Sequence, residues 1–268
     1  MTGPTRFLLF ALCVVLGQPA LADLLPPPRQ VSPHAWAWIG PYDAPSRENS
    51  GFRMNLGFVV GTAAVAVIDS GYSPQMAEVM LGQIRQQTPL PVRYVVNTNS
   101  QPHRFLGNEV FRQAGARIVA GQEAAERMTR DGPGMAAAAA EILGIATLPA
   151  PAAPDQLLGP GEVAQLDLGG GVTLDVRHVG TAHTKGSLIV AVAPDRAVFA
   201  GDMLYGGRLL ALIPDGSVKG WLAAYDALRA LDSTVVVPGH GEPGPLADFD
   251  QPTRTYLERL KRHVDDAV

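Results

Sequence analysis

The sequence predicts a mixed α/β fold in which two β-rich halves pack sheet on sheet, with helices on the outside. Short apolar, β-branched runs alternate with amphipathic stretches, as strands alternate with helices. Residues 146–161 form a connector rich in proline, alanine and glycine near the middle of the chain. The 268 residues are 47% hydrophobic and 17% charged, a composition that supplies a large core.

Residues 1–22 have the pattern of a secretory signal. Arg6 provides the basic start, residues 7–16 are apolar, and residues 20–22 (Ala-Leu-Ala) offer a cleavage site before Asp23. The apolar run is too short to span a membrane, which favours cleavage over an uncleaved anchor. We therefore expect a periplasmic mature protein with no membrane span after cleavage.

Cysteine chemistry is not expected in the mature chain. Cys13 is the only cysteine and lies inside the predicted signal, so no thiol remains as a nucleophile or metal ligand. The formal net charge is −4 and no basic run is present, so nucleic acid is not an expected partner. Residues 23–50, with three consecutive prolines, predict an extended lead-in to a main domain over 51–268.

The first half of the main domain predicts strands alternating with helices. A Gly-Thr turn at 61–62 between two apolar runs indicates a hairpin. Ser73 is suited to cap a helix that starts at Pro74 and ends before Pro89. The expected strands are 56–60, 64–68, 92–96 and 117–120, and the expected helices are 74–87, 109–114, 122–129 and 135–143.

The second half opens with another predicted hairpin, turned by three consecutive glycines at 169–171. Apolar residues on one stripe predict a helix over 219–231, and a last amphipathic helix is expected at about 252–264. The expected strands are 162–168, 172–179, 188–193, 197–200 and 234–237.

Polar side chains follow the ends of several predicted strands. Residues 97–108 form a polar loop directly after one strand, and His183, Asp202 and His240 each lie near a glycine just past another. Rigid sheets commonly present functional side chains on such loops. We therefore expect these residues to meet in one site.

These segments resemble the motifs of the metallo-β-lactamase superfamily over about residues 50–245. The loop follows the pattern Asn-Thr-His-x-His-x-Asp-His-x-x-Gly-Asn in its framing residues, and later segments follow Gly-x-x-His-Thr, Gly-Asp and Pro-Gly-His-Gly. The resemblance implies a four-layer αβ/βα sandwich and metal-dependent hydrolysis, in which a zinc pair activates water. The matching residues are Asn97, Thr98, Gly107, Asn108, His183, Asp202 and His240.

A narrower resemblance points to periplasmic zinc metallohydrolases associated with quinoprotein dehydrogenases and sulfur oxidation (SoxH-like). It rests on Pro102, on Gly-Asp-Met-Leu at 201–204, and on the run 215–231 before the last glycine-histidine motif. It implies a role in a quinoprotein or sulfur-oxidation pathway.

The metal-binding positions of the loop depart from the superfamily pattern. Asn99, Gln101, His103 and Arg104 stand where the family has His, His, Asp and His. Neutral amide oxygens suit zinc poorly, so we expect the first zinc site to be lost. Arg104 stays charged and cannot ligate a metal.

Two hypotheses remain open from the sequence. In the first, His103, Asp202 and His240 bind one divalent ion, zinc being the expected metal, with His183 as a fourth ligand or general base. Its substrate would be an ester, lactone or thioester, and His183, Asp202 and Arg104 would be the catalytic residues. In the second, Arg104 pairs with Asp202 and replaces the zinc pair. The protein would then be an inactive family member that binds a ligand or a periplasmic partner protein.

Overall fold

The computed structural model describes residues 24–267. The predicted signal, residues 1–22, lies outside the described residues. Within residues 24–267, no helix is long and apolar enough to cross a membrane.

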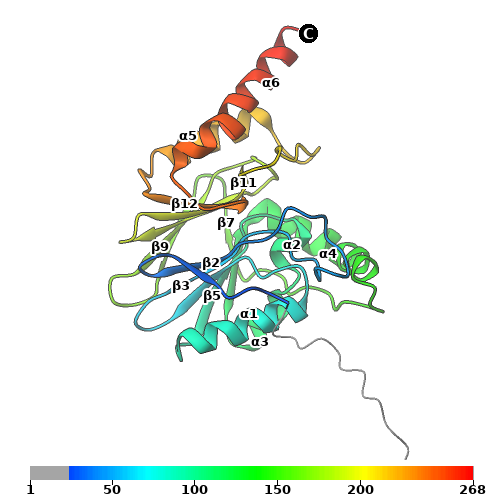
Figure 1. Ribbon diagram of the computed structural model, residues 1–268, viewed down its shortest axis with the longest axis vertical. Coiled ribbons are helices and arrows are strands. Elements are labelled where there is room, and N and C mark those ends of the chain that lie inside the picture. Colours follow the sequence, from blue (N-terminus) through cyan, green and yellow to red (C-terminus); the bar gives the residue numbers. More distant parts are fainter. Residues whose placement is uncertain (1–23, 268) are drawn as a thin grey trace, which may run out of the picture.

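Two sheets form the middle of the molecule (Figure 1). The first sheet has seven strands in the order β1-β2-β3-β4-β5-β6-β7, and the second has five in the order β12-β11-β10-β9-β8. The strands of the first sheet are β1 (Arg29–Ser32), β2 (Ala35–Trp38), β3 (Leu56–Val60), β4 (Val65–Ile68), β5 (Val92–Val96), β6 (Arg117–Gly121) and β7 (Gln156–Leu158). Those of the second sheet are β8 (Val163–Asp167), β9 (Thr173–His178), β10 (Leu188–Ala193), β11 (Ala197–Tyr205) and β12 (Val235–His240).

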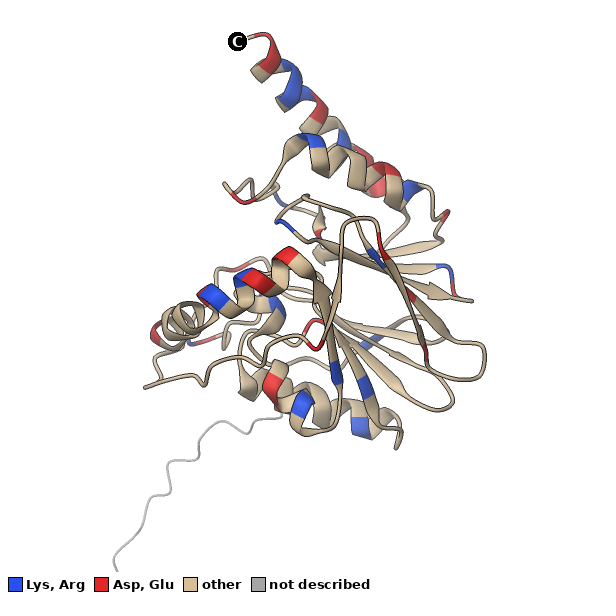
Figure 2. Ribbon diagram, turned by 180° about the vertical axis from the view of Figure 1, so that it is seen from behind, with Lys and Arg blue, Asp and Glu red and all other residues tan. Residues whose placement is uncertain are grey.

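Helices cover the outer face of each sheet (Figure 1). The first sheet carries α1 (Pro74–Gln87), α2 (Pro102–Phe105), α3 (Asn108–Gln113) and α4 (Gln122–Leu143). The second carries α5 (Val218–Arg229), the short helical turns η2 (Leu246–Phe249) and η3 (Asp250–Thr255), and α6 (Tyr256–Asp265). The end of α6 projects from the body, and acidic and basic residues are interspersed along it (Figure 2).

Three apolar clusters separate the four layers. One cluster packs the first sheet against its helices, a second lies between the sheets, and a third packs the second sheet against α5 and α6. Phe58, Val190 and Trp221 belong to the three clusters in that order, and each is fully or almost fully buried. Burial of this apolar area is the main force that holds the layers together. The predicted four-layer αβ/βα sandwich is thus confirmed.

Local signals placed most elements correctly. The Ser73 side chain accepts a hydrogen bond from the Met76 backbone amide at 3.1 Å and caps α1, as its sequence predicts. Strands β4, β5, β6 and β7 run parallel, and so do β11 and β12. Their carboxyl ends therefore lie along shared sheet edges.

Several elements differ from the sequence-based expectation. The helices expected at 122–129 and 135–143 are one helix, α4, with Pro133 inside it. A continuous buried stripe, including Met128, Gly132 and Ala136, packs on the core and outweighs the local cost of the proline. Strand β7 forms inside the predicted connector because it pairs with the edge of β6. Strand β1 lies in the predicted extended lead-in and pairs with β2, a strand that the alternating residues 34–40 predict, so that both lengthen the same sheet.

Candidate functional site

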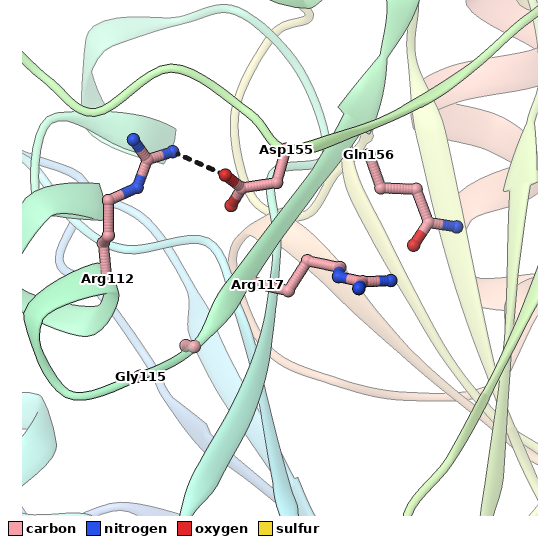
Figure 3. A pocket seen from close by; sticks show the side chains of 6 residues that line it. Arg112, Gly115, Arg117, Asp155 and Gln156 are labelled. Atoms are coloured by element: carbon pink, nitrogen blue, oxygen red, sulfur yellow. Dashed lines mark hydrogen bonds and ion pairs between the residues drawn. The ribbon is translucent and has the colours of Figure 1, made fainter.

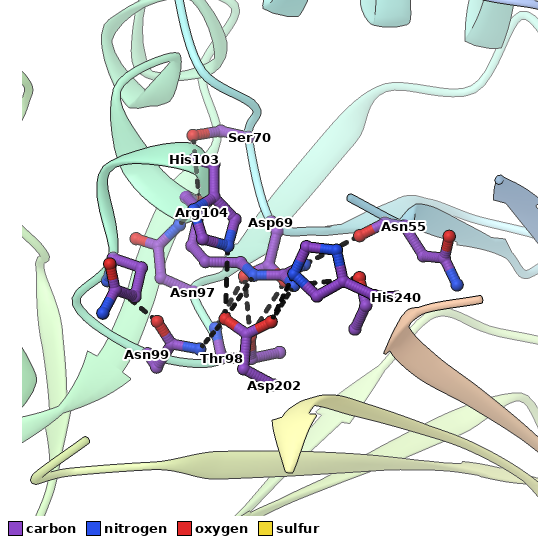
Figure 4. Close-up of polar contacts among 12 residues, drawn as sticks. Asn55, Asp69, Ser70, Asn97, Thr98, Asn99, His103, Arg104, Asp202 and His240 are labelled. Carbon is purple, nitrogen blue, oxygen red and sulfur yellow. Dashed lines mark hydrogen bonds and ion pairs between the residues drawn. The ribbon is translucent and has the colours of Figure 1, made fainter. Parts of the chain in front are cut away.

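The polar residues after the strands converge at one end of the two sheets (Figure 4). Asp69 follows β4, the loop 97–101 follows β5, Asp202 lies in the second half of β11, and His240 is the last residue of β12. Strand β11 runs five residues beyond its predicted end, with register shifts around Gly201 that interrupt its pairing with β12. Such irregularities redirect side chains at functional sites, and Asp202 lies within this segment.

Arg104 lies at the centre of the site and is fully buried. Its Nε donates to Asp202 Oδ2 at 3.1 Å and its Nη2 to Asp202 Oδ1 at 2.5 Å, a two-point ion pair. Nη1 donates to Asp69 Oδ2 at 3.1 Å and to the Asn55 carbonyl at 2.8 Å. Nη2 also donates to the Gly239 carbonyl at 3.1 Å. All five N–H groups of the guanidinium are therefore satisfied.

The Asp202 carboxylate is surrounded on both oxygens. Besides Arg104, Asn99 Nδ2 donates to Oδ2 at 2.8 Å and His103 Nε2 lies 3.2 Å from the same oxygen. His240 Nε2 lies 3.1 Å from Oδ1. A Cβ on Gly239 would meet Oδ1 at 2.6 Å, so the close approach of β12 requires glycine there.

The surroundings of Asp202 and Arg104 keep both side chains charged. Burial disfavours the charge of Asp202, but Arg104 and His103 outweigh it and hold the pKa of this carboxyl well below its ordinary value. Burial alone would lower the pKa of Arg104, but Asp202 and Asp69 raise it. Burial raises the pKa of Asp69 to about 6, against the pull of Arg104. The site thus contains an ionised carboxylate paired with a guanidinium.

The two histidines that face Asp202 are neutral. Burial lowers the pKa of His103 to about 3, and burial also lowers the pKa of His240. His240 Nδ1 lies 2.8 Å from the Arg53 carbonyl and Nε2 lies 3.1 Å from Asp202 Oδ1, and both of these oxygens can only accept. The single proton of the neutral ring can therefore serve only one of these two oxygens at a time.

His183 does not join this group. The ligand atoms of His103, Asp202 and His240 lie within 4.8 Å of one another, and His183 is outside the set. Its ring lies edge-on to Trp221 with centroids 5.5 Å apart, and its buried Nδ1 has no hydrogen-bond partner in the described structure. Burial lowers the pKa of His183, so it is neutral as well. Its predicted role as a ligand or base remains a prediction.

The framing residues of the loop build its shape. Asn97 and Asn108 bond each other through both side-chain amides, at 2.9 and 3.0 Å. Asn97 Nδ2 also donates to the Arg104 carbonyl at 2.8 Å, and the Ser70 hydroxyl to Asn108 Oδ1 at 2.8 Å. Every one of these residues is buried. This network holds the backbone of α2 so that Arg104 points at Asp202.

Asp69 belongs to the site, although it was not among the residues that the sequence predicted to meet there. Asp69 accepts from the Thr98 backbone amide at 2.7 Å, as a turn residue would, and also pairs with Arg104 at 3.1 Å. Its position at the end of β4, next to β5, was the available signal. The Asn55 and Gly239 carbonyls carried no such signal, because any residue has a carbonyl.

One other concave surface lies away from this site, at the edge of β6 and β7 (Figure 3). It is lined by Arg112, Gly115, Ala116, Arg117, Asp155 and Gln156. Arg112 pairs with Asp155 at 3.1 Å there. None of the predicted site residues lies in it.

Two comparisons with known proteins agree with this architecture. The family model described as the metallo-beta-lactamase superfamily matches residues 51–240. The chain belongs to this superfamily. A solved structure, the metallo-beta-lactamase from Pontibacter korlensis, is similar in fold with a TM-score of 0.66 and 20% sequence identity, over 86% of this chain and 98% of that one. The superfamily consists generally of hydrolases that bind divalent metals.

The residues of this member do not fit a zinc pair. The first zinc site would need ligands at Asn99 and Gln101, and the Asn99 amide already donates to Asp202. The second keeps His103, Asp202 and His240, a set that can hold one ion, but Arg104 occupies both oxygens of Asp202. The site that the structure builds is an ion pair with two neutral histidines beside it.

The stability of the protein is expected to fall on acidification because of His103. The folded state keeps this histidine neutral down to about pH 3, whereas the unfolded chain binds a proton near 6.5. Protons therefore favour unfolding between these values, with a slope of at most about 1.4 kcal/mol per pH unit. Urea unfolding at about pH 7 and about pH 5 measures this. The His103→Gln variant should lose less stability than the wild type, and equal losses would contradict the assignment.

Proposed function

We propose that this protein is a ligand-binding member of the metallo-β-lactamase superfamily whose site works without the zinc pair. The observation that supports the proposal is the complete satisfaction of Arg104. Its five N–H groups are used by Asp202, Asp69 and two backbone carbonyls, and the side chain is fully buried. In this proposal, the Arg104 guanidinium takes over the role that the zinc pair has in the superfamily.

Electrostatics oppose a metal ion beside this guanidinium. A divalent ion ~5 Å from a unit positive charge is repelled by roughly 7 kcal/mol at an effective dielectric of ~20. Arg104 cannot relieve this by losing its proton, since its neighbours raise its pKa. It also cannot move away without leaving the buried carboxylate of Asp202 unpaired.

A second candidate function is hydrolysis with one metal ion. One observation favours it: ligand atoms of His103, Asp202 and His240 lie within 4.8 Å of one another. A bound ion would supply a water of lowered pKa, and an ester, lactone or thioester would be the substrate. His183 would act as a fourth ligand or general base, as its motif implies.

We also propose that the protein is exported to the periplasm and serves a quinoprotein or sulfur-oxidation system. This part of the proposal is the same for the ligand-binding and the hydrolase candidates. Export rests on the pattern of residues 1–22, and the pathway link rests on the resemblance around 201–204 and 215–231. A periplasmic partner protein remains a candidate ligand.

Metal content decides between the two candidates. We expect purified protein, dialysed against zinc, iron or manganese, to retain no stoichiometric metal by inductively coupled plasma mass spectrometry. About one equivalent, lost in His240→Ala but kept in His263→Ala, would overturn the metal-free proposal and establish the single-ion site. His263 is the matched control because it is exposed on α6, outside the site.

A further inference from the structure

Two arginines near the site have no counter-ion in the described structure. Arg53 precedes β3 and Arg208 follows β11, and both are half-buried. Within residues 24–267 neither side chain forms an ion pair or hydrogen bond, and Arg53 Nε and Arg208 Nη1 are buried without a partner. Arg112 and Arg177 also have an unpartnered Nε, but each of them pairs with an aspartate through Nη2. Of these four arginines, only Arg53 and Arg208 have a guanidinium group with no ion-pair or hydrogen-bond partner in the described structure.

Both arginines are connected to His240, one of the histidines that face Asp202. The Arg208 guanidinium carbon is 5.9 Å from the centre of the Tyr205 ring, and Tyr205 stacks on His240 with centroids 4.9 Å apart. Arg53 offers its carbonyl to His240 Nδ1. Burial lowers the pKa of Arg53, and the charge of Arg208 lowers it further, as a close like charge does.

The charge balance of the site is therefore positive. Asp202 and Asp69 are taken up by Arg104, at 2.5 and 3.1 Å. Arg104 balances one of these two negative charges, so Arg53 and Arg208 bring one positive charge in excess. An anion that joins the site would offset this excess positive charge. Paired guanidinium groups present several N–H donors that match carboxylate or phosphate oxygens.

The segment after Arg208 adds an apolar surface. Leu209 is 77% exposed and Leu212 is 43% exposed, while Leu210 between them is buried. Exposed leucines next to an unmatched arginine suit a ligand that has an apolar body as well as a charged end.

We infer that Arg53 and Arg208 bind the oxyanion of an organic ligand with an apolar body, an aliphatic carboxylate being the simplest example. The inference deepens the proposed function by naming the ligand class of the same site. It does not depend on whether metal is present, because neither arginine is a candidate ligand of an ion.

Isothermal titration calorimetry at low salt with octanoate tests the inference. We expect wild-type protein to bind octanoate, and to bind acetate, inorganic phosphate and the neutral octanamide at least about tenfold more weakly. Arg53→Gln and Arg208→Gln should each weaken octanoate binding about tenfold or more, and the double variant further. Arg112→Gln, on the distant concave surface, should bind as wild type does. Thermal unfolding of each variant verifies that it is folded.

Several outcomes would overturn the inference. If the folded Arg53→Gln and Arg208→Gln variants bound octanoate with wild-type affinity, the two arginines would not be part of the binding site. If octanamide bound as tightly as octanoate, the site would not recognise the negative charge of the ligand. If inorganic phosphate bound as tightly as octanoate, the site would not recognise the apolar body. Failure of wild-type protein to bind octanoate would exclude the ligand class. Metal content measured on the same samples tests the metal-free proposal separately. A protein that holds metal and needs both arginines to bind octanoate would support the inference and overturn the metal-free proposal.

Discussion

Replacement of Arg104 by alanine is expected to destabilise the folded protein by about 3–5 kcal/mol. The substitution leaves the carboxylate of Asp202 buried with its principal counter-charge removed, and it also removes the partner of Asp69. The Asn55 and Gly239 carbonyls lose a donor at the same time. The free energy of unfolding from urea titrations at neutral pH measures the effect.

Two further variants make this result specific. Arg112→Ala removes an arginine from a partly exposed pair with Asp155, and should cost about 1 kcal/mol or less. The Arg104→Ala/Asp202→Ala double variant should be less destabilised than the sum of the single variants, because it leaves no unpaired charge at Asp202. An Arg104→Ala variant as stable as the wild type would show that the buried ion pair is not what holds the site.

Conversion of the loop to the superfamily pattern is expected to create zinc binding. The change is Asn99→His, Gln101→His, His103→Asp and Arg104→His made together. It removes the guanidinium and supplies imidazole and carboxylate ligands beside His183, Asp202 and His240, which the chain already has. We expect about two zinc ions per chain by mass spectrometry, against none retained by the wild type.

The fourth substitution carries most of this effect. A triple variant that keeps Arg104 should fail to load the second site, because the guanidinium still pairs with Asp202. The quadruple variant in an Asp202→Ala background should lose the bridging ligand and bind less zinc. If the quadruple variant folded but bound no zinc, residues outside the loop would also differ from what zinc binding in the superfamily requires.

The sequence by itself determined the fold and the location of the site. Strand-length apolar runs and the cap at Ser73 are local signals that act within a few residues, and the framing residues Asn97 and Asn108 act within one loop. The sandwich and the convergence of the strand ends followed from them. The length of helix α4 did not follow from local signals, because packing of its buried stripe outweighed the tendency of Pro133 to break the helix.

Only the tertiary structure decided what Arg104 does. The sequence left two destinations for this side chain, away from the site or onto Asp202, which lies 98 positions further along the chain. The choice depends on the Asn55 and Gly239 carbonyls and on Asp69, which come from three other segments and satisfy the remaining donors. A buried guanidinium is stable only when all of these partners are in place together. That condition is a property of the assembled sheets, and no local pattern in the sequence expresses it.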